Sequence, residues 1–319
     1  MKAVLRTTYS SPEVLSVGTA EQPIPKENEI LVRVRATTVN RTDGGILRGQ
    51  PWPIRLFTGL LKPTSAIPGT DFAGTVEAAG AQVTNFRVGD RVWGFHDNGL
   101  ASQAEYLTIP HHLAVLKIPE GVTEVEAVAC AEGGHYAYNF INNATVQPGD
   151  RVLVNGATGA IGTAAVQLLK HEGVHVTAVA NTKNIELVRS LGADQVIDYQ
   201  QEDFTQTNGQ YDFIFDTVGK STFSRCKHLL TPKGTYLSSE LGPHVENVYL
   251  PLVTKLTGRQ RVVFPVPSNC RRSLVFINEL QARGTFRAVI DRRYPMDDIQ
   301  EAYRYVEQGE KTGSVVVTY

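Results

Sequence analysis

A glycine turn between an apolar strand and a helix constrains the fold of this chain more than any other feature. Residues 151–184 read RVLVNGATGAIGTAAVQLLKHEGVHVTAVANTKN, in the order strand, glycine turn, helix and second strand. Gly156, Gly159 and Gly162 follow the first strand and stand at the head of the helix. A lone glycine triplet says little, but a βαβ unit of about thirty residues around it is what a dinucleotide-binding turn requires.

Each glycine has its own expected role in binding a pyrophosphate. Gly156 permits a tight turn, Gly159 lets the backbone approach the phosphates, and Gly162 lets the helix pack closely on the sheet. The positive end of the helix and its free N–H groups would attract the phosphate charge. The other residues of this phosphate-binding turn are Ala157, Thr158, Ala160 and Ile161. The alternative is a turn whose glycines serve packing alone.

The end of the second strand lacks the acidic residue that an NAD site usually places about 20 residues after the turn. The strand ends in AVA and is followed by Asn181, Thr182, Lys183 and Asn184. A carboxylate would repel a 2′-phosphate, whereas amide, hydroxyl and ammonium donors would bind it with charge-assisted hydrogen bonds. We therefore predict NADPH as the cofactor, with Lys183 as the main cation. The alternative is that this segment only caps the next helix, with Asn181 or Thr182 as the N-cap.

Composition excludes several other classes of protein. The 319 residues carry a net charge of −1, so no basic excess indicates nucleic acid or an anionic membrane as a partner. Three widely spaced cysteines are typical of a reduced protein, and we expect a cytoplasmic one. The first residues show no long apolar run or cleavage site, so we expect no signal peptide. No stretch reaches the roughly 18 uninterrupted apolar residues that a membrane helix needs.

The chain changes character twice along its length. Residues 1–126 are rich in β-branched residues, glycine and proline, and include EILVRVRATTVN, which alternates as a half-buried strand should. Residues 127–268 alternate apolar strands with helical patterns, which indicates a doubly wound parallel sheet. Residues 269–319 contain two helices and a final strand that we expect to return to the first domain. The fold class is therefore α/β plus β, with a barrel-like domain and a parallel-sheet domain.

Several motifs occur together and in a fixed order over nearly the whole length. They are VNRTD, PGTDFAGTV, VGDRVWGF, AEYLTIP, PGDRVLVNGATGAIGTAAVQLLK, LGADQVIDY, DTVG and GSVVVTY. With them the chain resembles the zinc-independent quinone oxidoreductase branch of the medium-chain dehydrogenase/reductase family. The resemblance implies a GroES-like β-barrel catalytic domain, completed by 269–319, and a Rossmann domain over 127–268. It also implies a homodimer that joins Rossmann sheets edge to edge, with QRVVFPVP as the edge strand.

The positions that hold zinc in metal-bearing relatives carry other residues here. Asn40 stands where those relatives have a cysteine ligand, and Gly69-Thr70-Asp71 replaces a Gly-His-Glu. A catalytic zinc needs about three ligands of the Cys, His or carboxylate type, and Asn40 and Thr70 are poor ones. The segment that matches the structural-zinc loop is short and has no cysteine. We predict that no metal is bound.

Without a Lewis acid, alcohol oxidation through a zinc alkoxide is not expected. What remains is hydride transfer to an acceptor activated by conjugation, such as a quinone or an α,β-unsaturated carbonyl. The resemblance places Asn40 beside the nicotinamide and the acceptor carbonyl; the alternative is a strand-end Asn that satisfies turn backbone. The rival functions are an alcohol or aldehyde dehydrogenase and a low-turnover, NADPH-binding redox sensor.

Two further catalytic candidates follow from positions where the chain departs from its relatives. His135 stands where a threonine is usual, and it could bond the acceptor oxygen or supply a proton. Tyr136 is the second candidate. Ordinary packing is the alternative for both. Gly45 replaces a tyrosine that many quinone reductases carry five residues after the Asn.

The remaining predicted contacts to the cofactor lie at strand ends. Val218 and Gly219 of DTVG, and Ser238 of YLSS, follow sheet strands at the end where ligands bind in open α/β folds. Tyr199 resembles a family tyrosine beside the 2′-phosphate. For Asp216 the alternative is an acceptor that only forms the turn.

Residues 44–69 form a Pro-rich apolar segment with Trp52 and Phe57. Such a wall suits a small hydrophobic carbonyl or quinone substrate. The alternative is a loop packed on the barrel.

Overall fold

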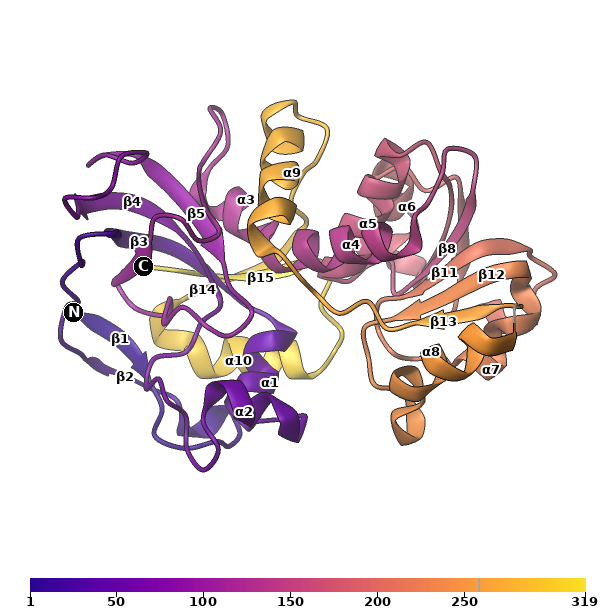
Figure 1. The fold of residues 1–319 in the computed structure, drawn as a ribbon, viewed down its shortest axis with the longest axis horizontal. Coiled ribbons are helices and arrows are strands. Elements are labelled where there is room, and N and C mark those ends of the chain that lie inside the picture. The colour runs from indigo at the N-terminus through magenta and orange to yellow at the C-terminus, as the bar shows by residue number, and fades with distance from the viewer. Residues whose placement is uncertain (258) are drawn as a thin grey trace. The chain divides into compact units, whose positions relative to one another are not determined.

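The computed structural model describes residues 1–257 and 259–319 and divides them into two compact units. The first comprises Met1–Glu132 and Asn269–Tyr319, and the second comprises Gly133–Ser268 (Figure 1). They are named here, after their expected roles, the catalytic unit and the nucleotide unit. The boundary expected after residue 126 falls inside helix α3 (Glu124–Ala129), which belongs wholly to the catalytic unit.

A seven-stranded sheet forms most of the catalytic unit. Its order is β14-β15-β3-β4-β5-β7, and β6 also pairs with β3. The strands are β3 (Glu29–Val39), β4 (Asp71–Ala79), β5 (Arg91–Phe95), β6 (Tyr106–Pro110), β7 (Val115–Lys117), β14 (Ile290–Pro295) and β15 (Ser314–Thr318). A separate two-stranded ribbon consists of β1 (Lys2–Leu5) and β2 (Ser16–Thr19).

The last strand of the chain pairs with β3 from the first third of the chain. β15 runs antiparallel to β3, with Val315 opposite Val39 and Val317 opposite Thr37. This pairing confirms the expectation that the C-terminal segment returns to the first domain. The helices of the unit are α1 (Arg41–Arg48), α2 (Arg55–Thr58), α3, α9 (Cys270–Ala282) and α10 (Ile299–Glu307).

β3 is buried more completely than its alternating sequence predicts. Only Arg33 and Arg35 of its eleven residues are exposed. β15, β6 and β4 pair along the edges of β3, and α3 packs against it, so neighbours from distant parts of the chain contribute to its burial. The core beneath it includes Ile30, Phe72 and Val92, all fully buried. Burying side chains of this size stabilises the fold by about 1.5–3 kcal/mol each.

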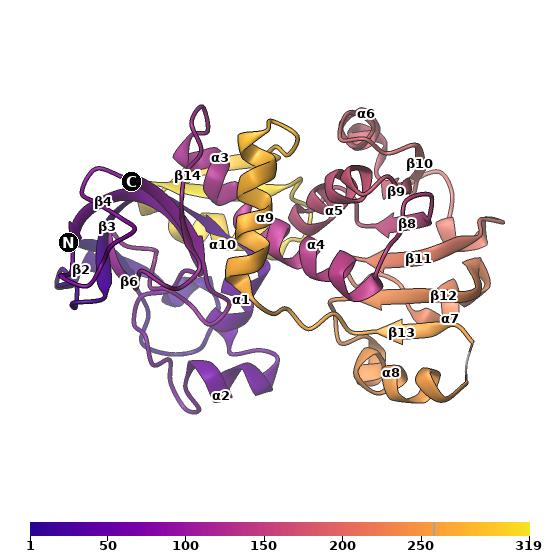
Figure 2. The same cartoon turned by 45° about the horizontal axis from the view of Figure 1, so that its top comes forward.

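The nucleotide unit is built on a parallel sheet, as the sequence predicts. Its order is β10-β9-β8-β11-β12-β13, and all pairs of neighbours run parallel (Figure 2). The strands are β8 (Arg151–Asn155), β9 (His175–Ala180), β10 (Gln195–Asp198), β11 (Tyr211–Asp216), β12 (Leu230–Ser238) and β13 (Arg261–Val263). The helices are α4 (Ala131–Ala144), which begins in the catalytic unit, α5 (Ala160–His171), α6 (Ile185–Ser190), α7 (Phe223–Cys226) and α8 (Glu246–Thr257).

The strand order reverses direction between β8 and β11, because β9 and β10 extend to one side of β8 and β12 and β13 lie beyond β11. In open α/β sheets, ligands bind outside the carboxyl ends of the strands at such a switch point. The fold therefore directs attention to the residues that follow β8 and β11.

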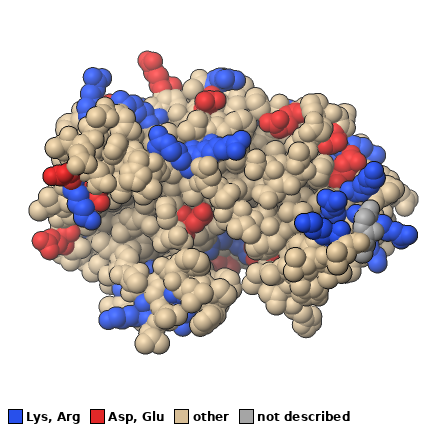
Figure 3. Space-filling model, viewed as in Figure 1, with Lys and Arg blue, Asp and Glu red and all other residues tan. Residues whose placement is uncertain are grey.

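Acidic and basic side chains occur in both units on the face shown in Figure 3, and most of that surface is neither. This agrees with the net charge of −1. Among the described residues, no helix combines the length and the apolar character that crossing a bilayer would demand.

Candidate cofactor and substrate site

The turn between β8 and α5 has room for glycine only at two of its three glycine positions. Gly156 has a φ of +81°, and a Cβ there would lie 2.8 Å from the Cβ of Val218. A Cβ on Gly162 would lie 2.1 Å from the carbonyl oxygen of Gly156. At Gly159 the nearest such atom is 3.6 Å away, so that side of the turn is open. A ligand can therefore approach the backbone at Gly159, whose own N–H donates to the carbonyl oxygen of Gly156 at 3.1 Å.

The first turn of α5 begins at a residue without a side chain. Gly159 is the N-cap residue, and it makes no side-chain capping bond to the helix terminus. The first N–H groups of a helix have no partner within the helix, and they carry the positive end of its dipole. Ala160, Ile161 and Gly162 occupy this first turn. An uncapped glycine-lined helix end of this kind fits a dinucleotide pyrophosphate.

Residues at the carboxyl ends of three strands lie in one row. Asn155, Asp216 and Ser238 are in register across β8, β11 and β12. The Asn155 amide donates to Asp216 Oδ1 at 3.0 Å, and the Tyr236 hydroxyl donates to Asp216 Oδ2 at 2.8 Å. Burial raises the pKa of Asp216, and the bond from Tyr236 opposes that effect.

Asp216 shapes the loop that follows β11. Its Oδ1 accepts the N–H of Gly219 at 3.0 Å, and its Oδ2 accepts the N–H of Ser221 at 3.3 Å. This is the turn-forming role that we gave as the alternative. These hydrogen bonds hold the loop so that Val218 lies against Gly156 in the glycine turn. Ser238 is fully buried, and its hydroxyl accepts the N–H of Glu240 at 3.3 Å.

The residues predicted to bind a 2′-phosphate follow β9. Thr182 and Lys183 are exposed and lie in a short 3₁₀ turn, Thr182–Asn184. Neither of the predicted capping bonds is present: the Asn181 side chain caps nothing, and the Thr182 hydroxyl donates instead to Asp198. The backbone N–H of Tyr199 donates to Ala180 at 3.0 Å, which brings Tyr199 beside this segment.

Asp198 is a member of this cluster that sequence reasoning missed. It ends β10, and parallel pairing places it opposite Ala180, at the end of β9. Its Oδ1 accepts the N–H of Gln200 at 3.0 Å while its Oδ2 holds Thr182. The acidic residue at the end of QVID is visible in the sequence, but its bond to Thr182 depends on the pairing of β9 with β10.

In the catalytic unit, Asn40 sits between β3 and α1 and is almost completely buried. Its Oδ1 accepts the N–H of Asp43 at 2.8 Å and so caps α1. Its Nδ2 donates to the hydroxyls of Thr70 at 2.9 Å and Thr38 at 3.2 Å. Two positions that hold zinc ligands in metal-bearing relatives, 40 and 70, are thus joined by a hydrogen bond.

Three buried carboxyl groups surround this Asn. Burial raises the pKa of Asp71 to about 7, against hydrogen bonds from Thr38 that act to lower it. Burial also raises the pKa of Asp43 well above its ordinary value, and the Asp71 charge adds to this effect. Glu132 has a raised pKa for the same reason, and it accepts the hydroxyl of Thr42 at 2.9 Å. Sequence reasoning singled out neither Asp43 nor this cluster.

His135 and Tyr136 lie on α4 in the nucleotide unit. His135 is fully buried, and its backbone carbonyl accepts the Asn139 amide at 2.8 Å. Tyr136 is half-buried, and its ring meets that of His135 edge-on with centroids 5.5 Å apart. Buried packing, the alternative for His135, is thus present, and the catalytic roles of both residues stay predictions.

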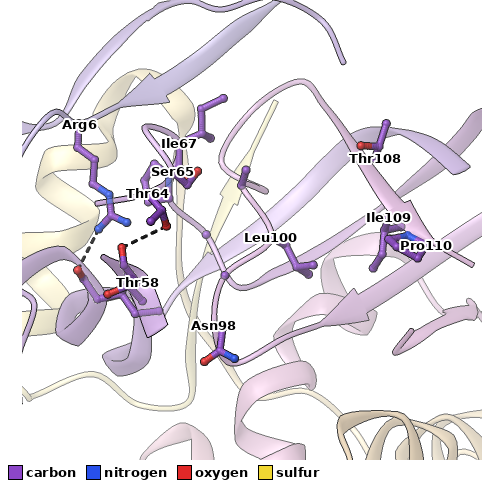
Figure 4. Close-up of a pocket in the computed structure, with 15 residues that line it drawn as sticks. Arg6, Thr58, Thr64, Ser65, Ile67, Asn98, Leu100, Thr108, Ile109 and Pro110 are labelled. Atoms are coloured by element: carbon purple, nitrogen blue, oxygen red, sulfur yellow. Dashed lines mark hydrogen bonds between the residues drawn. The ribbon is translucent and has the colours of Figure 1, made fainter. Parts of the chain in front are cut away.

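The segment 44–69 folds into the end of α1, a short turn at Trp52–Ile54, α2 and an extended return. Trp52 is 60% exposed and Phe57 is 69% exposed, so neither is packed on the barrel. A pocket of about 370 Å³ is lined in part by the last residues of this segment, Thr64 to Gly69 (Figure 4). The backbone has no room for a side chain at Gly45, the position where many quinone reductases carry a tyrosine. A Cβ there would lie 2.9 Å from the carbonyl oxygen of Gln50.

Comparison with known proteins places this geometry among oxidoreductases. The alcohol dehydrogenase GroES-like domain family matches residues 26–120, and the zinc-binding dehydrogenase family matches residues 191–317. The 2-methylene-furan-3-one reductase of Solanum lycopersicum is 32% identical over 99% of this chain and 79% of its own. The chloroplast envelope quinone oxidoreductase homolog of Arabidopsis thaliana is 31% identical over 92% of this chain and 91% of its own. The structure of the quinone oxidoreductase from Coxiella burnetii superimposes with a TM-score of 0.87 and 25% identity, covering 100% of this chain and 99% of that one.

Proposed function

Because the chain belongs to the medium-chain dehydrogenase/reductase family, in its zinc-independent quinone oxidoreductase branch, we propose that it reduces a quinone or an α,β-unsaturated carbonyl with NADPH. The observation that carries the proposal is the open, uncapped glycine turn at the head of α5. When bound there, the nicotinamide cofactor supplies the hydride. The protein has to hold the dinucleotide, orient the acceptor and exclude water.

The acceptor class is supported by the residues around Asn40. The amide and hydroxyl groups of Asn40, Thr38 and Thr70 are hydrogen-bonding groups of the kind that polarise a conjugated carbonyl. We propose that Asn40 donates one amide hydrogen to the acceptor oxygen, in exchange for its bond to a threonine. Exchanging one neutral hydrogen bond for another costs little free energy. His135 and Tyr136 are the proposed sources of the proton.

A turnover panel tests the proposed function. We expect NADPH oxidation with 1,4-benzoquinone, 9,10-phenanthrenequinone and simple enals, and no oxidation of primary or secondary alcohols with NADP⁺. Tight NADPH binding without turnover of any acceptor would favour the redox sensor instead. Alcohol oxidation that a chelator abolishes would favour the dehydrogenase.

Replacing Asn40 with serine separates its capping role from its proposed role toward the acceptor. Serine is as good an N-cap as asparagine, so α1 keeps its cap, and the loss of the two amide hydrogen bonds to Thr38 and Thr70 should lower the free energy of unfolding by about 1–3 kcal/mol. Its shorter hydroxyl cannot take the place of the amide donor, and we expect kcat/KM for the acceptor to fall by about 10- to 100-fold. Denaturant unfolding and steady-state kinetics measure the two effects. Wild-type kinetics in this variant would contradict the role.

The preference for NADPH is proposed to depend on Lys183. Asp198 engages the Thr182 hydroxyl, which leaves the Lys183 ammonium as the strongest donor to a 2′-phosphate. Lys183→Gln should weaken NADPH binding by about tenfold, the value of one charge-assisted hydrogen bond, and leave NADH binding unchanged. Arg189→Gln is the matched control, since that exposed arginine pairs with Glu186 on the same segment. An equal loss for both cofactors in Lys183→Gln would refute the assignment.

We also propose a homodimer through β13, one of the two end strands of the described parallel sheet. β13 has β12 as its neighbour at the end of the sheet order. An unprotected edge strand is a template for pairing with a second copy. Light scattering should give about twice the chain mass of 34.9 kDa. A monomer at micromolar concentration is the result that would rule this out.

A further inference from the structure

The pocket in the catalytic unit is lined by a single charged side chain, Arg6. Residues from separate stretches of the chain surround it (Figure 4), among them Arg6, Thr58, Thr64, Ile67 and Leu100. Its volume of about 370 Å³ falls in the range of small-molecule sites.

Arg6 is buried and makes few bonds. Its side chain follows β1 and is only 4% exposed. Nη1 donates to the carbonyl oxygen of Ile46 at 3.0 Å, and Nε has no partner. Among the described residues, no carboxylate lies within ion-pair distance of its guanidinium. Of its five N–H groups, one has a hydrogen-bond acceptor among the residues that the structure describes.

Asp43, a carboxyl group that favours the charge on Arg6, compensates that charge only in part. Asp43 acts on Arg6 only at a distance, and burial shifts Asp43 toward its neutral form. Burying an unpaired guanidinium is costly, since a buried charge is normally paired. The cost would be recovered if the missing acceptor arrives with a ligand.

The walls of the pocket define the chemistry of that ligand. The guanidinium of Arg6 is directed toward Thr58 and Thr64 (Figure 4). Their hydroxyls already donate to the carbonyl oxygens of Ile54 at 3.1 Å and of Thr58 at 3.2 Å, so Arg6 is the side chain that has donors to offer an anion. Ile67 and Leu100 contribute apolar side chains to the lining. A planar guanidinium fork matches a carboxylate, and one cation without a helix terminus or a lysine suits a monoanion better than a phosphate. We propose that this pocket binds a small organic carboxylate through Arg6, with the apolar body of the ligand along Ile67 and Leu100.

The competing explanation gives Arg6 a purely structural task. Ile46 lies in the last turn of α1, and a cation near a helix C-terminus is stabilising. That task uses one N–H group and does not require a pocket. A binding measurement therefore separates the two explanations, and a measurement without cofactor or acceptor keeps it independent of the proposed function.

Calorimetry of the full chain with 3-phenylpropionate and the uncharged 3-phenylpropionamide tests the proposal. We expect the acid to bind at least about tenfold more tightly than the amide, as one charge-assisted hydrogen bond implies. Arg6→Gln should remove this preference, and Arg6→Lys should keep part of it. Arg55→Gln is the control, because Arg55 bonds Gly49 in the same region but does not line the pocket. It should keep the full preference.

A second variant covers the case in which Arg6→Gln fails to fold. Leu100→Trp should fill the pocket and weaken the acid and the amide alike. Equal binding of acid and amide by the wild type would overturn the proposal, and so would undiminished acid binding by Leu100→Trp. Adding 3-phenylpropionate to the turnover assay distinguishes the source of the carboxylate: competition with the acceptor identifies a group of the substrate, and binding without competition identifies a separate ligand.

Discussion

Replacing Gly159 with alanine is expected to weaken NADPH binding by about 100-fold while leaving the fold intact. Gly159 has a φ of −74°, which alanine adopts freely, and a Cβ there would have its nearest neighbour at 3.6 Å. The methyl group would instead occupy the space in which the pyrophosphate meets the turn. Losing two charge-assisted hydrogen bonds to the phosphates accounts for the expected factor. Fluorescence titration with NADPH measures it.

Gly162→Ala is the contrasting variant. Its Cβ would lie 2.1 Å from the carbonyl oxygen of Gly156, so the turn has to move. Overpacking of this kind costs about 1–3 kcal/mol or more, and we expect the free energy of unfolding to fall accordingly. If Gly159→Ala binds NADPH as the wild type does, the pyrophosphate does not lie over this turn.

Replacing Asp71 with asparagine is expected to remove a large pH dependence of stability. Burial raises the pKa of Asp71 from 3.8 to about 7. Between about pH 4 and pH 7, the unfolded chain has lost this proton and the folded chain still holds it, so the free energy of unfolding falls as the pH rises. Above pH 7 both states are ionised and the contribution is constant. The total effect of such a shift is about 4 kcal/mol.

Asparagine preserves the shape and most of the bonds of Asp71. Its oxygen can accept the N–H of Thr38, which Asp71 Oδ1 accepts at 2.6 Å, and its amide can donate to the Thr38 hydroxyl. In urea unfolding from pH 4 to pH 8, the free energy of unfolding of the variant should increase relative to that of the wild type as the pH rises.

Asp194→Asn is the control for this pH series. Although burial acts to raise the pKa of Asp194, bonds from Lys170 and the Val176 backbone hold it below its ordinary value. The contribution of that carboxylate to the free energy of unfolding is fully present above about pH 4. Its removal should lower stability evenly between pH 5 and pH 8. A parallel pH dependence of wild type and Asp71→Asn would show that Asp71 is ionised in the folded state throughout.

The sequence predicted the architecture because the architecture is encoded locally. Alternating strands and helices predict the parallel sheet, and the glycine triplet identifies the strand after which a phosphate would bind. The return of β15 to β3 was also predicted. The burial of β3 on both faces was not, because it depends on which strands and helices pack against it, and these come from distant parts of the chain.

The same limit applies to the candidate site. Asn40 and Thr70 were recognised as replaced zinc ligands, but their bond to each other depends on the position of β3 beside β4. Asp198 reaches Thr182 only through the pairing of β9 with β10. Arg6 has no sequence motif around it, and the absence of a counter-charge becomes visible only when its described neighbours are placed in space. Local sequence patterns do not reveal contacts between segments that are far apart in the sequence.

We propose that NADPH reduces a conjugated acceptor on this protein without help from a bound metal. The most direct test measures NADPH oxidation with 9,10-phenanthrenequinone and determines metal content on the same sample, before and after exhaustive chelation. We predict an unchanged kcat/KM in protein that contains far less than one metal ion per chain. Activity that disappears with chelation and returns in proportion to added zinc would contradict the account.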